Sequence, residues 1–140
     1  LVTDAGTPAI SDPGEDIVAL CAERGVPVTS IPGACAAVNA LSLSALATGR
    51  FAFEGFLSTN TGERKKRLSE IARERRTMIF YEAPHKLITT LQDLHECFGD
   101  RRISICRELT KINEEIFDFV RRFDAYCGDD DSFAYSVRRK

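Results

Sequence analysis

The chain has 140 residues, of which 44% are hydrophobic and 29% are charged, and its formal net charge is −2 at pH 7. This size and balance allow a buried core and favour an ordinary globular domain. The net charge argues neither for nor against nucleic-acid binding, and no segment approaches the roughly 20 consecutive apolar residues of a membrane span.

The first notable segment covers residues 4–14, with the sequence Asp-Ala-Gly-Thr-Pro-Ala-Ile-Ser-Asp-Pro-Gly. It contains two clusters of turn-forming residues and follows a short apolar pair that is typical of the end of a strand. In open α/β sheets, ligands bind at loops beyond the carboxyl ends of the strands. The segment therefore predicts a ligand-binding loop, with a purely structural turn as the alternative.

The next elements alternate between helix and strand. Asp12 is expected to cap a helix whose first turn contains Pro13, and Gly25 suits the position just after its end. Residues 26–31 are typical of a strand and are followed by a Pro-Gly pair. Residues 34–46 are rich in Ala, Ser and Leu, which favours a small-residue helix.

Alternation continues in the second half of the chain. Residues 51–56 alternate strictly, which predicts a strand with its aromatic side buried. A second strand is expected at 77–82, a helix at 87–98 ended by Gly99, and a further strand at 103–106. A regular succession of strands and helices indicates an α/β fold.

Residues 63–76 form a basic stretch, with seven positive and three negative side chains, a local excess of +4. Two interpretations stay open. The stretch is either the solvated face of a helix or a surface for the phosphate backbone of a nucleic acid. The candidates for nucleic-acid contact are Arg64, Lys65, Lys66 and Arg67.

The cysteines are odd in number and never spaced as Cys-x-x-Cys: Cys21, Cys35, Cys97, Cys106 and Cys127. Buried free thiols in a reducing cytoplasm are the natural interpretation. With only two histidines, a His-rich zinc centre is excluded, and no metal site is expected.

Five motif blocks together carry a family resemblance: residues 4–14, 32–36, 53–57, 76–82 and 107–111. In this order and spacing they resemble the S-adenosylmethionine-dependent methyltransferases that modify a cytidine ribose of small-subunit ribosomal RNA. That family lies within the tetrapyrrole methylase superfamily. The resemblance covers roughly residues 1–115, and the family's chains begin with a further strand and loop, so this chain is expected to be a fragment.

The resemblance implies two α/β subdomains with the cofactor cleft between them and with the N-terminal part missing. Residues 1–48 would be the end of the N-terminal subdomain and residues 49–115 part of the C-terminal one. Residues 116–140 depart from the family pattern and are expected to be a divergent tail.

The activity implied is methyl transfer from S-adenosylmethionine to a ribose 2′-hydroxyl of a cytidine in 16S ribosomal RNA of the small subunit. The resemblance further implies a cytoplasmic homodimer that does not involve a membrane. Two alternatives remain: a methyltransferase acting on a tetrapyrrole (porphyrin precursor), and an inactive fragment of either enzyme.

The resemblance also assigns roles to individual residues. Loops of small residues allow the main chain to approach a cofactor closely. The implied cofactor-binding residues are Asp4, Ala5, Gly6, Thr7, Ala9, Cys35, Ala36, Tyr81 and Glu82. Lys111 and Glu108 are the catalytic candidates, although Lys111 and Arg107 could instead hold an RNA phosphate, and Glu108 could simply pair with Arg107.

Overall fold

The computed structural model describes residues 1–3, 6–118 and 138–139. The chain divides into two compact units, Leu1–Ala36 (unit 1) and Ala37–Lys140 (unit 2). The compact units divide after Ala36, whereas the subdomain boundary was expected at residue 48. That boundary concerns the subdomains of the family and stays a prediction.

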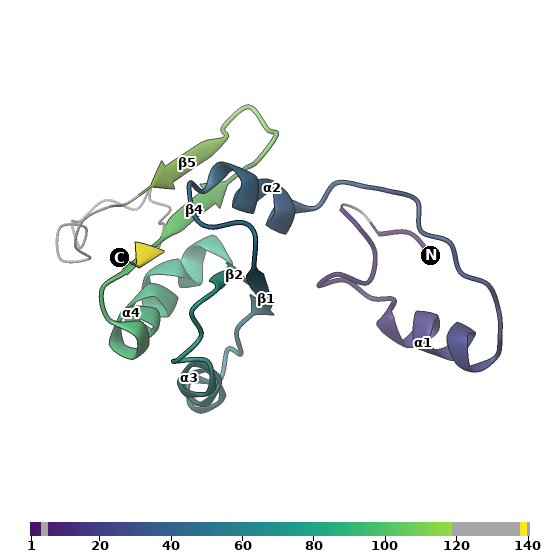
Figure 1. Ribbon diagram of the computed structural model, residues 1–140, viewed down its shortest axis with the longest axis horizontal. Coiled ribbons are helices and arrows are strands. Elements are labelled where there is room, and N and C mark those ends of the chain that lie inside the picture. The colour runs from purple at the N-terminus through teal and green to yellow at the C-terminus, as the bar shows by residue number, and fades with distance from the viewer. Residues whose placement is uncertain (4–5, 119–137, 140) are drawn as a thin grey trace. The chain divides into compact units, whose positions relative to one another are not determined.

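Unit 1 contains the helix α1, Glu15–Glu23, with extended loops on both sides (Figure 1). Its C-terminus is as expected: Gly25 adopts a φ of 63°, in the left-handed region. The N–H of Gly25 donates to Ala22 O, and the N–H of Val26 donates to Cys21 O, which satisfies the last carbonyls of the helix.

The predicted start of α1 was wrong. Gly14 is the N-cap residue, no side chain caps the helix, and Asp12 and Pro13 precede it. Gly14 has a φ of 143° and Ser11 a φ of 58°, neither of which is compatible with a continuous right-handed helix. The helix therefore starts only at Glu15.

The strand expected at residues 26–31 was also wrong. These residues form no strand in the described part of the chain, and Val26, Val28 and Ile31 are exposed. The apolar pattern indicates a segment that is able to pair with a neighbouring strand. A strand forms only where a neighbouring strand supplies hydrogen bonds.

Helix α2, Ala36–Leu43, begins at the last residue of unit 1 and otherwise belongs to unit 2; it is shorter than the helix expected at 34–46. Ser44 ends it locally, because its hydroxyl donates to Leu41 O at 2.8 Å and accepts from the N–H of Leu46 at 3.2 Å. Serine commonly competes in this way with the helical hydrogen-bond pattern.

The two strands β1 (Phe51–Phe56) and β2 (Thr77–Tyr81) form a parallel pair, which confirms both strand predictions. Their register contains a bulge at Glu54, which lies between the pairs Phe53–Ile79 and Gly55–Phe80. Because of this extra residue, Phe56 pairs with Tyr81 and stays on the same face as Phe53.

Helices α3 (Thr61–Glu70) and α4 (Leu87–Phe98) supply the core of unit 2. A short 3-10 helix, Pro84–Lys86, precedes α4. The core consists of Leu68, Leu91 and Leu94, against which Phe80 of β2 packs. One face of the β1–β2 pair is therefore covered by these helices (Figure 1).

This packing overturns the expectation that the aromatic side of β1 is buried. Phe51, Phe53 and Phe56 are 41%, 38% and 61% exposed, because they lie on the face opposite Phe80. Strict alternation shows that a strand has two different faces. Which face meets the helices depends on tertiary packing.

The remaining strands are antiparallel. Strand β4 (Ser104–Arg107) confirms the expected strand near 103–106 and pairs with β5, Glu115–Asp118. Strand β3 (Arg101–Arg102) pairs with β6, Arg138–Arg139. The mixture of helices and strands agrees with an α/β fold. Within the described ranges, no helix has the length and apolar character needed to cross a bilayer.

Candidate functional site

The two loops that the sequence singled out in unit 1 lie side by side. The Thr7 hydroxyl donates to Ala34 O at 3.1 Å, across 27 positions of sequence. A Cβ built on Gly6 would lie 3.6 Å from Ala34 O, and one on Gly33 would lie 3.6 Å from Thr7 Oγ1. Both distances are ordinary van der Waals contacts, so it is the left-handed φ of 75° that favours glycine at Gly6.

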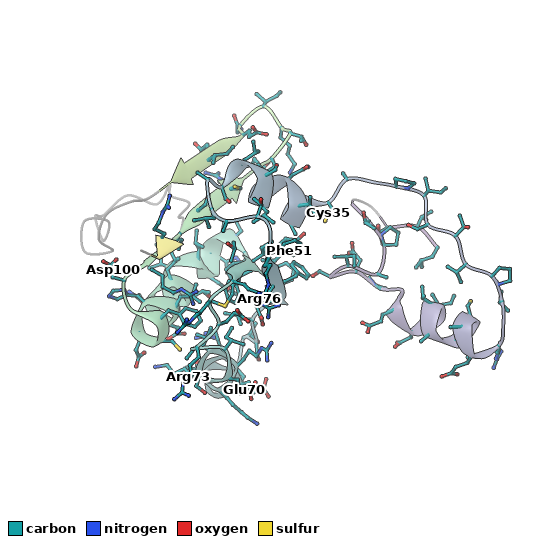
Figure 2. All side chains as sticks on the ribbon, in the orientation of Figure 1. Cys35, Phe51, Glu70, Arg73, Arg76 and Asp100 are labelled. Carbon is teal, nitrogen blue, oxygen red and sulfur yellow. The ribbon has the colours of Figure 1, made fainter. Side chains whose placement is uncertain are left out.

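The other candidates of unit 1 flank this contact. Ala9 adopts a left-handed φ of 65°, Cys35 is partly buried directly before α2, and Ala36 begins that helix (Figure 2). Asp4 and Ala5 lie outside the described residues. The structure therefore brings Gly6 and Thr7 together with the loop that leads into Cys35.

Tyr81 lies at the end of β2 in unit 2, on the exposed aromatic face. Its hydroxyl accepts a hydrogen bond of 3.1 Å from the N–H of Ala37, which holds the start of α2 to the strand end. The rings of Phe53 and Phe56 lie edge-on to Tyr81, with centroids 5.1 and 5.4 Å away. These two phenylalanines were not expected as site residues, although the alternation in β1 was a signal for them.

Glu82 follows Tyr81 and uses both carboxylate oxygens within the chain. Oε2 accepts from the hydroxyl of the buried Thr90 at 2.6 Å, and Oε1 accepts from the N–H of Ala83 at 2.8 Å. This carboxylate therefore holds the loop after β2 to α4. The position of the loop that follows Tyr81 is thereby fixed.

The segment after β4 presents two exposed ion pairs. Lys111 Nζ lies 3.0 Å from Glu108 Oε2, and Arg107 Nη1 lies 3.1 Å from Glu115 Oε2. Arg107 thus pairs with the neighbouring strand, and Glu108, which was considered as its partner, pairs with Lys111. Glu108 and Thr110 both have left-handed φ values, of 51° and 65°, which gives this turn a defined shape.

The basic residues of α3 are mostly engaged within the chain. Arg64 is buried, and its Nε lies 2.7 Å from Asp93 Oδ2. Lys65 pairs with Glu96 at 2.7 Å, which raises the pKa of the lysine, and Arg67 pairs with Glu54 at 2.7 Å, which raises the pKa of the arginine. Both interpretations of this stretch had treated these charges as open to solvent or ligand. Arg64 is instead buried and paired with Asp93, so its charge is open to neither.

Four of the five cysteines lie in the described part of the chain. Cys21, Cys35 and Cys97 are free and partly buried. Cys106 is also partly buried, and its Sγ donates to Ala40 O at 3.8 Å, while Cys127 lies outside the described residues. Burial raises the pKa of the Cys97 thiol, so it remains protonated at neutral pH. Among the described residues, no group of three or more His, Cys, Asp or Glu side chains could hold a metal ion.

Sequence comparison decides the family. A model of the family described as Tetrapyrrole (Corrin/Porphyrin) Methylases matches residues 1–122. The chain belongs to the tetrapyrrole methylase family. The match extends past Glu115, where the sequence was expected to depart from the family pattern.

Several relatives of this tetrapyrrole methylase carry the same name, ribosomal RNA small subunit methyltransferase I. The protein from Synechocystis is 52% identical over 84% of this chain, and that from Haemophilus influenzae is 50% identical over 83%. The Pasteurella multocida protein is 46% identical over 93%. The aligned regions make up 42%, 41% and 47% of these relatives, so the chain spans less than half of their length.

Members of the tetrapyrrole methylase family use S-adenosylmethionine as the methyl donor, and the residues of this chain fit such a group. Adenosine and an amino-acid end both need backbone donors and acceptors at close range. The loops at Gly6 and Gly33 are exposed and contact each other. They offer backbone donors and acceptors without bulky side chains.

Proposed function

We propose that this tetrapyrrole methylase acts in the transfer of a methyl group from S-adenosylmethionine to a cytidine ribose 2′-hydroxyl of 16S ribosomal RNA. The observation that carries the proposal is the identity of about one half to relatives named as ribosomal RNA small subunit methyltransferases. The alternative, methylation of a tetrapyrrole, rests on the family name alone. The relatives therefore favour RNA as the acceptor.

In this proposal the cofactor is held by the residues that the family resemblance implies. The proposed contacts are Asp4, Ala5, Gly6, Thr7, Ala9, Cys35, Ala36, Tyr81 and Glu82. When bound, S-adenosylmethionine supplies an electrophilic methyl carbon on a cationic sulfur. The role of the chain is to hold both reactants in line, since orientation is the main requirement of such a displacement.

The contact between the two loops is expected to matter for cofactor binding. Replacing Thr7 with valine keeps the shape of the side chain and removes the hydrogen bond to Ala34 O. We expect the dissociation constant for S-adenosylmethionine to rise about two- to tenfold, as for the loss of one hydrogen bond of about 0.5–1.5 kcal/mol. Calorimetric titration measures this directly.

Thr29 provides the matched control, because it is an exposed threonine of the same unit. Thr29→Val is expected to leave the dissociation constant unchanged. Equal affinities of Thr7→Val and the unsubstituted chain would contradict a cofactor-binding role for the paired loops.

For the acceptor side we propose Glu108 and Lys111 as the catalytic residues. The 2′-hydroxyl is a weak nucleophile until its proton begins to leave, so a positioned base or charge assists it. Lys111→Ala is expected to lower the rate of methyl transfer by about tenfold or more. A smaller loss, measured at saturating cofactor, would remove Lys111 from the mechanism and leave its pair with Glu108 a structural contact.

The RNA partner is proposed to meet the exposed cations of the chain. Lys66 is exposed on α3 and enters no ion pair in the described part of the chain, whereas Lys65, Arg67 and Arg107 would exchange a carboxylate for a phosphate. Arg64 is left out of this interface because it is buried against Asp93. We further propose that the protein is a homodimer. We also propose a cytoplasmic location, which the thiols favour. The proposed subdomains are residues 1–48 and 49–115, followed by the tail 116–140.

Two measurements test the function. Calorimetry with S-adenosylmethionine tests cofactor binding, and transfer of a radioactive methyl group tests small ribosomal subunits and a porphyrin precursor as acceptors. The Haemophilus influenzae relative serves as the positive control. Labelling of ribosomal RNA supports the proposal. Labelling of the porphyrin precursor alone would establish the alternative, and cofactor binding without any transfer would indicate an inactive fragment.

A further inference from the structure

A hollow with an unusual concentration of arginine lies on unit 2, and it shares no residue with the proposed cofactor site. It has a volume of about 690 Å³ and is open to solvent. Four arginines and two glutamates line it together with Ile71, a net charge of +2. Figure 2 labels Glu70, Arg73 and Arg76, which belong to the end of α3 and the turn that leads into β2.

The turn beneath the hollow is firmly built around Glu74. Its N–H donates to Ile71 O at 2.9 Å, and its Oε1 accepts from the N–H groups of Arg75 and Arg76, both at 2.8 Å. Its Oε2 pairs with Arg76 Nη2 at 2.6 Å. Arg76 thereby lowers the pKa of Glu74 to about 2, so this arrangement persists at neutral pH.

Strand pairing adds the fourth arginine to the same edge. Phe51 and Thr77 form the first pair of the parallel strands β1 and β2. Arg50 and Arg76 come directly before these two residues, so they lie at the same end of the strand pair. The Thr77 hydroxyl also donates to Ala47 O at 2.6 Å, which ties the segment before β1 to the start of β2. Residues far apart in sequence therefore place like charges around one hollow.

Most of this positive charge is not neutralised within the chain. Three exposed arginines enter no ion pair in the described part of the chain: Arg50, Arg73 and Arg75. The two carboxylates of the hollow are already engaged, Glu74 with Arg76 and Glu70 with Arg67. Like charges that share a surface repel each other unless an anion lies between them.

Helix electrostatics accounts for only one nearby arginine. Arg67 lies in the last turn of α3, where a cation favours the negative end of the helix dipole. That effect falls off within the last turn. Arg73 and Arg75 follow the helix end by several residues, so the dipole does not explain them.

We propose that this hollow binds the phosphodiester backbone of RNA, with Arg50, Arg73 and Arg75 as the contact residues. The inference rests on the proposed function, which makes RNA the acceptor. Guanidinium groups suit phosphate because they donate two parallel hydrogen bonds. A wide, solvent-open hollow with exposed arginines from two segments suits several phosphates of an extended strand better than one enclosed phosphate group.

The test is binding of a short, fluorescent single-stranded RNA of mixed sequence, followed by anisotropy at several salt concentrations. The Arg73→Gln/Arg75→Gln double variant is expected to weaken binding about tenfold or more. It is also expected to flatten the slope of log affinity against log salt by about 0.7 for each phosphate that is no longer neutralised. Glu70→Gln removes a negative charge from the hollow and is expected to tighten binding, a gain that misfolding cannot produce.

Arg24→Gln is the matched control, because Arg24 is an exposed cation of unit 1 that enters no described ion pair. It is expected to bind RNA as the unsubstituted chain does. Unchanged affinity of the double variant, or no salt-dependent RNA binding by the unsubstituted chain, would overturn the proposal. So would binding to phosphatidylglycerol vesicles, and not to RNA, that depends on the same arginines. RNA binding that requires these arginines, without methyl transfer, would count against the proposed function alone.

Discussion

Replacing Leu68 with alanine is expected to lower the free energy of unfolding of unit 2 by about 2–5 kcal/mol, the usual cost of truncating a fully buried leucine. Leu68 is 1% exposed and lies at the centre of the core with Leu91 and Leu94. Alanine would leave a cavity between α3 and α4 that this small core has few side chains to fill. Urea denaturation followed by circular dichroism measures the change.

The control for this prediction is the same substitution at an exposed position. Leu43, at the end of α2, is 45% exposed, and Leu43→Ala is expected to change the free energy of unfolding by only about 0.5 kcal/mol. Similar effects of the two variants would show that α3 and α4 do not pack around Leu68 as described.

Replacing Asp93 with alanine is expected to cost about 3–5 kcal/mol of stability, because it leaves the buried guanidinium of Arg64 without its counter-ion. The side chains of Arg64 and Asp93 are only 9% and 11% exposed, and their atoms Nε and Oδ2 are 2.7 Å apart. The carbonyls of Ser58 and Thr59 would remain as acceptors but carry no full charge. The same denaturation experiment applies.

A second ion pair between the same two helices provides the comparison. Lys65 and Glu96 also lie 2.7 Å apart, but their side chains are 50% and 68% exposed. Glu96→Ala is therefore expected to cost at most about 1 kcal/mol, since water replaces the lost partner. If Glu96→Ala proved as costly as Asp93→Ala, burial could not be what distinguishes the two pairs.

These two pairs explain why the basic stretch could not be interpreted from sequence alone. Arg64 and Lys65 are adjacent and of similar chemistry, yet one is part of the interior and the other lies at the surface. Helical spacing places them on different sides of α3. Only the position of α4 decides which side becomes buried.

Local structure was well predicted where a residue acts on its own backbone. Gly25 and Gly99 each end a helix, because glycine adopts a positive φ without steric cost. The strands β1 and β2 follow from their side-chain patterns, and the α/β class follows from the alternation of elements. Motif blocks, which combine local turns with fixed spacing, were sufficient to indicate the family.

Apart from the start of α1 and the end of α2, which local backbone geometry decides, the errors occurred where distant parts of the chain decide the outcome. The apolar run at residues 26–31 is able to form a strand, but in the described structure no neighbour pairs with it. The face of β1 that carries Phe51, Phe53 and Phe56 is exposed because α3 and α4 pack against the other face, next to Phe80. Neither result is contained in the residues of the segment concerned.

Residue patterns were sufficient to predict the family, the strands β1, β2 and β4, and the helix α4. These depend on backbone preferences and periodicity, which act over a few residues. Three contacts became visible only in the folded chain: Thr7 with Ala34, Tyr81 with Ala37, and the arginines of two separate segments around one hollow. Such contacts depend on packing between residues far apart in the chain, which no local pattern encodes.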